Sequence, residues 1–284
     1  MIALPGPLVD VDWLAARLGE PTLHVVDATW YMPAENRPGR DEFRKAHIPG
    51  AVFFDIDEIA DRSSDLPHML PPPGAFADAA ARLGLSADEA VVVYDGQGVF
   101  SAPRVWWTLR VMGFSKVAVL DGGLPAWRAA GHPLESGDPA ERAAPKPKSA
   151  RFRPELVRSL NQVQATLESG SAQVVDARPA PRFRGEAPEP RPRLRGGHMP
   201  GAANLPWSAL VADGRVRPPA ELEAAFEKVG VSLDHPIVAT CGSGVSAAVL
   251  ALGLAILGRD DAAIYDGSWS EWGGRSDTAV VTGP

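Results

Sequence analysis

The residues with the clearest potential for chemistry lie in one short segment near the C-terminus. Cys241 is the only cysteine of the chain, and it is followed by Gly242-Ser243-Gly244-Val245-Ser246 and an Ala- and Leu-rich stretch. The glycines allow the backbone to curl, and the stretch that follows favours a helix. A curled turn directs N–H groups inward, and a helix N-terminus adds partial positive charge. A sulfur at the centre of this turn would be stabilised as a thiolate, the reactive form of cysteine, or as a persulfide anion.

A second copy of the turn lies earlier in the chain. Gly96-Gln97-Gly98-Val99 matches the Gly-x-Gly-Val core of the cysteine loop, and Asp95 stands in the position of Cys241. A lone cysteine at the end of a strand is often just a small buried apolar residue, but glycines retained in both copies indicate an architectural turn. The sequence therefore predicts one working site, in the C-terminal half.

The whole chain is a repeat of this kind. Three segments recur in the same order, 149, 151 and 145 residues further on: Val25-Val26-Asp27-Ala28 at 174–177, His47-Ile48-Pro49-Gly50-Ala51 at 198–202, and Asp121-Gly122 at 266–267. Matches at nearly one offset predict two homologous domains, over residues 1–135 and 153–284. The stretch 136–152 contains Gly137, three prolines and two lysines, and it is predicted to be an exposed linker.

Each half alternates between strand and helix signals. The runs 90–94 and 236–240 are almost continuously apolar, as in strands buried on both faces of a parallel sheet. Helical stretches are predicted at 76–83, 102–112, 221–229 and 247–257. This pattern predicts an α/β fold with two tandem domains, each an open, mainly parallel sheet with helices on both faces. Ligands of such sheets bind beyond the carboxyl ends of the strands, which is where Cys241 follows its strand.

Composition excludes several function classes. The net charge of −7 disfavours binding to nucleic acid or to anionic membranes. The longest apolar stretch, 247–257, is too short to span a bilayer, and the first twelve residues have no signal-peptide pattern. A single cysteine forms no internal disulfide, which favours a reducing compartment, expected to be the cytoplasm. One Cys and six scattered His give no metal-ligand spacing, and no dinucleotide fingerprint occurs, so no cofactor is expected.

At this point the chain resembles the two-domain rhodanese-like sulfurtransferases. The repeated Val-Val-Asp-Ala, His-x-Pro-Gly-Ala and Asp-Gly-x-x-x-x-Trp elements are similar to that family's signatures and cover almost all of the chain. The cysteine loop resembles the C-G-S-G-V-T form of the 3-mercaptopyruvate sulfurtransferases, with Ser246 in the place of Thr. Thiosulfate-preferring members carry C-R-K-G-V-T, and both cations are absent after Cys241.

The resemblance implies an activity and a set of site residues. It implies that sulfur passes from 3-mercaptopyruvate to Cys241 as a persulfide, and then to cyanide or an external thiol such as a thioredoxin-like protein. Arg182 and Arg191, in segments resembling D-A-R-x-x-x-R-F-x-G and P-E-P-R, would bind the substrate carboxylate and carbonyl. The resemblance also places Ser243 in a relay with His47 and Asp41. His47 precedes Pro-Gly, however, which also suits a structural role.

Three other activities compete with this interpretation. The first is a thiosulfate:cyanide sulfurtransferase. The second is a cysteine phosphatase or arsenate reductase, which needs Cys-x5-Arg to hold an oxyanion, whereas Ala247 ends the loop here. The third is a non-catalytic sulfur carrier or binding module, because Asp95 shows that one copy has lost its nucleophile.

Overall fold

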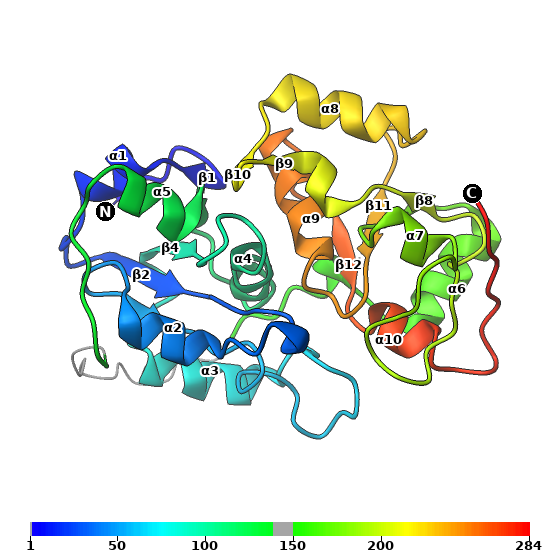
Figure 1. The fold of residues 1–284 in the computed structure, drawn as a ribbon, viewed down its shortest axis with the longest axis horizontal. Coiled ribbons are helices and arrows are strands. Elements are labelled where there is room, and N and C mark those ends of the chain that lie inside the picture. The colour runs from blue at the N-terminus through cyan, green and yellow to red at the C-terminus, as the bar shows by residue number, and fades with distance from the viewer. Residues whose placement is uncertain (1, 139–149) are drawn as a thin grey trace. The chain divides into compact units, whose positions relative to one another are not determined.

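The computed structural model describes residues 2–138 and 150–284. Contacts between residues divide the chain into two compact units (Figure 1). The N-terminal unit comprises Met1–Arg62, Leu70–Arg153 and Asp213–Val216, and the C-terminal unit comprises Ser63–Met69, Pro154–Ala212 and Arg217–Pro284. The units are therefore not contiguous halves of the chain, because Ser63–Met69 belongs to the C-terminal unit and Asp213–Val216 belongs to the N-terminal unit. Most of the predicted linker 136–152 lies outside the described residues.

The N-terminal unit is built on a five-stranded sheet in the order β1-β5-β4-β2-β3. Every pair of neighbours is parallel. All residues of β2, β4 and β5 are buried, as expected from the almost purely apolar composition of β4 and β5, and β2 also buries His24 and Asp27. The strands are β1 (Leu8–Val9), β2 (Leu23–Asp27), β3 (Val52–Phe53), β4 (Ala90–Tyr94) and β5 (Val117–Leu120).

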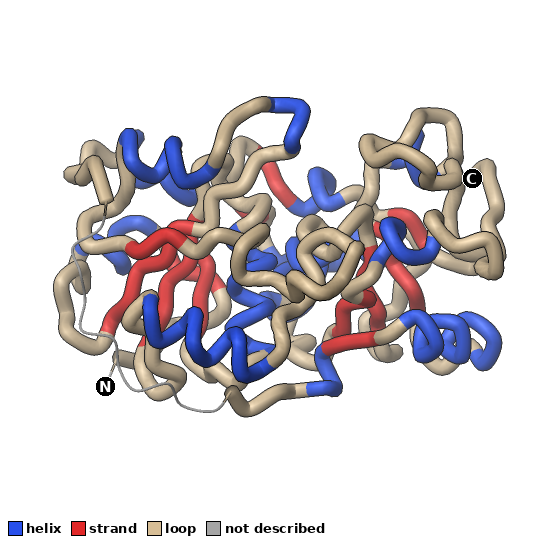
Figure 2. Tube along the Cα trace, turned by 90° about the horizontal axis from the view of Figure 1, so that it is seen from below, coloured by secondary structure: helices blue, strands red, loops and turns tan. Residues whose placement is uncertain are grey.

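Helices flank this sheet. Leu14, Phe43 and Trp127, from α1, α2 and α5, join one buried cluster with alternate residues of the strands. α4 packs against β4 and β5 and contributes no residue to that cluster. Figure 2 shows the strands with helices on either side. The helices are α1 (Val11–Ala15), α2 (Gly39–Lys45), α3 (Pro73–Arg82), α4 (Ala102–Val111) and α5 (Gly123–Ala129), with the 3-10 turn η1 (Pro33–Glu35).

The C-terminal unit repeats the same plan. Its sheet has the order β6-β12-β11-β7-β8, again with every pair of neighbours parallel. The strands are β6 (Val157–Arg158), β7 (Gln173–Asp176), β8 (Ala203–Asn204), β11 (Ile237–Thr240) and β12 (Ala263–Tyr265). The α/β class and the two similar sheets confirm the predicted fold.

The helices of the C-terminal unit complete the layers around the sheet. α9 is buried along nearly its whole length, because apolar residues surround its axis instead of forming one stripe. The remaining elements of this unit are η2 (Pro154–Leu156), α6 (Leu160–Ser169), α7 (Ala180–Phe183), η3 (Trp207–Leu210), β9 (Val211–Ala212), α8 (Pro219–Lys228), α9 (Ala247–Ile256) and α10 (Ser268–Trp272), whereas β10 (Arg215–Val216) belongs to the N-terminal unit. Among the described residues, no helix is both long enough and apolar enough to cross a membrane.

Candidate active site

The cysteine loop leaves the carboxyl end of β11 and is tied to the next strand–helix connection. Cys241 is 2% exposed, and its N–H donates to Ser268 Oγ at 3.3 Å. Its carbonyl accepts from Trp269 N–H at 2.9 Å. The carbonyl of Gly242 accepts from both the N–H and the hydroxyl of Ser270, at 2.9 and 2.7 Å. These bonds hold the loop in one conformation, so the position of the thiol is set by the fold.

Glycine is required inside the turn for a backbone reason. Gly244 has φ +78°, in the region that favours glycine, and Gly98 in the other copy has φ +110°. The turn then runs into α9, for which Ser246 is the N-cap residue without a side-chain capping bond. Val245 is buried beside it. The predicted curl between strand and helix is therefore present in both copies.

The silent copy of the turn shows what this backbone binds. The Asp95 carboxylate accepts four backbone hydrogen bonds of 2.8–2.9 Å from its own loop. The donors are Gln97, Phe100, Ser101 and Ala102. Three of these N–H groups converge on a single oxygen, so the turn is an anion cradle filled by a covalently attached carboxylate. The same turn in the C-terminal unit starts with a sulfur in place of this carboxylate.

A histidine absent from the predicted site lies beside the cysteine loop. His68 Nδ1 is 3.0 Å from Ser243 Oγ, and both residues are 6% exposed. His68 belongs to Ser63–Met69, the segment that packs with the C-terminal unit, and its φ of +61° is unusual for a residue with a side chain. His68 and Ser243 are 175 residues apart and belong to no common sequence motif, so the sequence did not predict this contact.

The predicted relay of Ser243 with His47 and Asp41 stays a prediction, and the contacts that the structure gives these side chains are with other groups. Ser243 bonds His68 instead, whereas His47 Nδ1 bonds the Phe43 carbonyl at 2.8 Å and its ring stacks on Phe43 at 3.9 Å. Asp41 is exposed on α2 and pairs only weakly, at 4.0 Å, with Arg44. His198 repeats the same stacking and carbonyl bond with a phenylalanine. Because the two histidines share this arrangement, their role is to anchor the Pro-Gly turns.

Arg182 reaches the cysteine loop from α7. A Cβ atom added to Gly242 would lie 3.1 Å from Arg182 Nη2. Arg182 donates to Glu189 Oε2 through Nε at 3.2 Å and through Nη2, and its side chain is 20% exposed. The guanidinium is thus held at Gly242 by a carboxylate that is itself 1% exposed. A side chain at position 242 would crowd this cation, which glycine leaves undisturbed.

Glu189 is the centre of a buried ion network. Its second oxygen accepts from Arg178 Nη1 at 2.8 Å, and Arg178 also binds both oxygens of Asp176 at the end of β7. The Arg178 guanidinium lies 4.1 Å from the centre of the Trp269 ring. Burial opposes the charge on Arg178, but the two carboxylates outweigh it and its pKa is raised. The ion pairs Asp176–Arg178, Arg178–Glu189 and Glu189–Arg182 therefore connect the end of β7 to the cysteine loop. They fix where the Arg182 guanidinium lies relative to the sheet.

The other arginines of this region have different surroundings. Arg191 is partly buried in the loop that follows Glu189. Arg195 donates to the carbonyls of Trp272, Gly273 and Thr278, so it ties the C-terminal segment down. Within residues 2–138 and 150–284, no group of three or more His, Cys, Asp or Glu side chains could hold a metal ion.

Fold and site together define a tandem of rhodanese-type domains with one cysteine loop. The sequence model of the Rhodanese-like domain matches residues 10–130 and 159–275. The chain belongs to the family of rhodanese-like domain proteins and is a sulfurtransferase of its two-domain class.

Three relatives illustrate this membership. The chain is 46% identical to the 3-mercaptopyruvate sulfurtransferase of Escherichia coli strain K12, over 96% of each chain. It is 47% identical to the mitochondrial thiosulfate/3-mercaptopyruvate sulfurtransferase 1 of Arabidopsis thaliana, over 98% of this chain and 79% of the relative. The crystal structure of a 3-mercaptopyruvate sulfurtransferase from Escherichia coli matches with a TM-score of 0.86 at 44% identity, covering 93% of this chain and 99% of the other.

Proposed function

We propose that this enzyme takes sulfur from 3-mercaptopyruvate as a persulfide on Cys241 and passes it to an external thiol or to cyanide. The Cys241 thiolate attacks the donor sulfur, an Sγ–S bond forms, and the carbon–sulfur bond of the donor breaks. The electron pair leaves on the pyruvate enolate, which takes up a proton to give pyruvate. The acceptor then removes the outer sulfur and regenerates the thiolate.

The observation that carries the proposal is the pairing of a single thiol with an anion-binding turn. In the silent copy the turn binds a carboxylate through four N–H groups. In the C-terminal copy the corresponding groups follow Cys241 and are suited to a thiolate, or to the terminal sulfur of a persulfide. This arrangement favours a carried anionic sulfur over a buried structural cysteine.

The surrounding side chains support a donor with a carboxylate. Arg182 lies at Gly242, and its planar guanidinium can bind a carboxylate through two hydrogen bonds. We assign the same purpose to Arg191. Neutral residues at 242 and 243 remove the cations that a dianion such as thiosulfate would need beside the sulfur. In this proposal Ser243, whose Oγ lies 3.0 Å from His68 Nδ1, moves the proton released by the donor thiol and taken up by the enolate.

The acceptor comes from outside the chain, because Cys241 has no second cysteine to resolve its persulfide. A small thiol or a thioredoxin-like dithiol meets this need. A reducing compartment such as the cytoplasm keeps both the nucleophile and such an acceptor in the thiol state. We propose it as the site of action.

Intact-protein mass spectrometry after incubation with 3-mercaptopyruvate tests the nucleophile. The expected result is a single added sulfur on Cys241 with pyruvate formed in equal amount, and a dithiol should then remove that sulfur. The Cys241→Ser variant should show neither. Full turnover by Cys241→Ser would refute the scheme, and a persulfide that no thiol discharges would favour a sulfur carrier.

A comparison of donors tests the substrate. We expect kcat/KM for 3-mercaptopyruvate to exceed that for thiosulfate, and Arg182→Gly to lower the first much more than the second. Arg184→Gly is the matched control, because Arg184 lies on the same segment and pairs with Glu186 at the surface. Faster turnover of thiosulfate would establish a thiosulfate:cyanide sulfurtransferase and overturn the argument from Gly242.

A further inference from the structure

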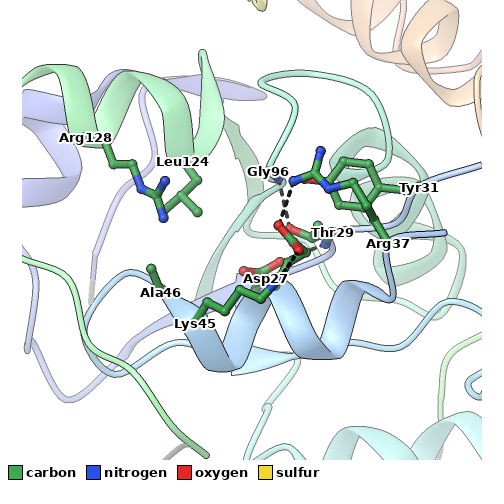
Figure 3. Close-up of a pocket in the computed structure, with 10 residues that line it drawn as sticks. Asp27, Thr29, Tyr31, Arg37, Lys45, Ala46, Gly96, Leu124 and Arg128 are labelled. Atoms are coloured by element: carbon green, nitrogen blue, oxygen red, sulfur yellow. Dashed lines mark hydrogen bonds and ion pairs between the residues drawn. The ribbon is translucent and has the colours of Figure 1, made fainter. Parts of the chain in front are cut away.

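The N-terminal unit has a pocket at the carboxyl ends of β2 and β4, the place that corresponds to the cysteine site in the other unit. Its cavity measures about 170 Å³, far above the 10–15 Å³ that one water needs. Figure 3 shows its residues, with Asp27 lying among the side chains of Arg37, Lys45 and Arg128. Nothing in the sulfurtransferase reaction uses these residues.

The internal repeat explains why the pocket exists. At the offsets of the internal repeat, four residues that line the pocket correspond to Arg178 and to three residues that surround its guanidinium in the C-terminal unit. In the C-terminal unit that guanidinium binds Asp176, donates to the Gly197 carbonyl at 2.9 Å and stacks on Trp269. The counterparts in the N-terminal unit, in the order of Asp176, Arg178, Gly197 and Trp269, are Asp27, Thr29, Ala46 and Leu124. Thr29 and Leu124 are shorter than Arg178 and Trp269, so the volume of the arginine and part of the indole is vacated.

The same replacement leaves a buried carboxylate without its cation. Asp27 is 1% exposed, and Oδ1 accepts from Thr29 N–H at 2.8 Å. Oδ2 has no hydrogen-bond partner among the residues that the structure describes. Burial raises the pKa of Asp27 to about 6, although interactions with Thr29 and Tyr94 lower it in part. At neutral pH the base of the pocket is therefore a carboxylate that lacks the positive donor its twin possesses.

The mouth of the pocket has the opposite charge. Arg128 lines it from α5. Lys45 donates to Glu42 at 2.7 Å and keeps two further donors. Arg37 also binds Glu42 and stacks on the Tyr31 ring at 4.0 Å, which closes one side (Figure 3). An anionic group at the mouth would meet Arg128 and Lys45.

We propose that this pocket binds a small zwitterion of the α-amino acid class, with its ammonium on Asp27 Oδ2 and its carboxylate on Arg128 and Lys45. The ammonium replaces the guanidinium that the C-terminal unit supplies from its own chain. The carboxylate of the ligand pairs with the cationic side chains at the mouth of the pocket, and the side chain of the ligand faces Leu124. The pocket is a ligand site separate from Cys241, and its occupancy does not depend on the sulfur donor.

Isothermal titration of the wild-type enzyme tests the proposal with three probes of similar size. L-alanine carries both charges, propionate lacks the ammonium, and ethylamine lacks the carboxylate; none has a thiol that could react at Cys241. We expect L-alanine to bind at least about ten-fold more tightly than either partial probe, equivalent to about 1.4 kcal/mol. Propionate binding as tightly as L-alanine would overturn the proposal in favour of an anion site, and no heat with L-alanine would overturn it outright.

Two variants locate the binding. Thr29→Arg installs the side chain of the other copy beside Asp27 and should abolish L-alanine binding while persulfide formation on Cys241 continues. Arg128→Gln should weaken L-alanine at least about ten-fold and leave ethylamine unchanged, with about 1.4 kcal/mol corresponding to that factor. Arg82→Gln is the matched control, because Arg82 likewise lies in the last turn of a helix of the same unit and does not line the pocket. Unchanged L-alanine affinity in Arg128→Gln would refute the orientation even if Thr29→Arg failed to fold.

Discussion

Replacement of Glu189 by glutamine tests how the fold positions Arg182. The Glu189 carboxylate is 1% exposed and joins Arg178 to Arg182 through hydrogen bonds to both guanidinium groups. Glu189→Gln keeps the shape, removes the charge and directs an amide N–H₂ at a cation. Breaking a buried ion pair by removing one partner costs about 3 kcal/mol, which corresponds to a midpoint of thermal unfolding lower by about 10 °C.

The same substitution has a kinetic signature that loss of stability alone does not produce. Without Glu189 the Arg182 guanidinium is no longer held at Gly242, so its bonds to the donor carboxylate weaken. A charge-assisted hydrogen bond contributes about 1.5–3 kcal/mol, so kcat/KM for 3-mercaptopyruvate should fall about 10- to 100-fold, mainly through KM. Discharge of preformed Cys241 persulfide by cyanide should be unchanged, because that half-reaction has no donor carboxylate.

Stopped-flow measurement of the two half-reactions separates these effects, with Glu186→Gln as the control. Glu186 pairs with Arg184 on the same segment, but that pair is exposed, and neither stability nor kinetics should change. If Glu189→Gln kept wild-type KM, Glu189 would not position Arg182. If both half-reactions slowed equally, a general disturbance of the unit would explain the data instead.

Three further predictions concern other buried groups. His68→Gln should lower the rate of persulfide formation about 100-fold, as expected for loss of a proton-transfer partner; an unchanged rate would leave His68 a packing residue. Asp95→Ala strips the acceptor from four N–H groups and should destabilise the N-terminal unit by about 3–5 kcal/mol, measured by urea unfolding, while Cys241 still forms a persulfide. The pKa of Asp27, raised to about 6 by burial, exceeds its unfolded value of about 3.9, so the native state binds more protons and stability should fall, by at most about 3 kcal/mol, as the pH rises from about 4 to 6. Asp27→Asn should flatten that slope in urea titrations, and an equal slope in the variant would assign it to other groups.

The amino-acid sequence by itself determined the local and repeated features. Apolar runs set the buried strands, and glycines before an apolar stretch marked the turn between β11 and α9, because both signals lie within a few neighbouring residues. The repeat identified the domains and the silent position Asp95. Arg182 was found only through its motif.

Tertiary structure alone decided which side chains meet. Ser243 bonds His68 across 175 residues, and this depends on the path of Ser63–Met69, which joins the C-terminal unit. His47 had the better sequence context but is turned toward Phe43. The pocket at Asp27 likewise exists because Thr29 and Leu124 are smaller than Arg178 and Trp269, their counterparts in the C-terminal unit. Partners and cavities of this kind depend on distances between distant parts of the chain, which periodicity and spacing do not encode.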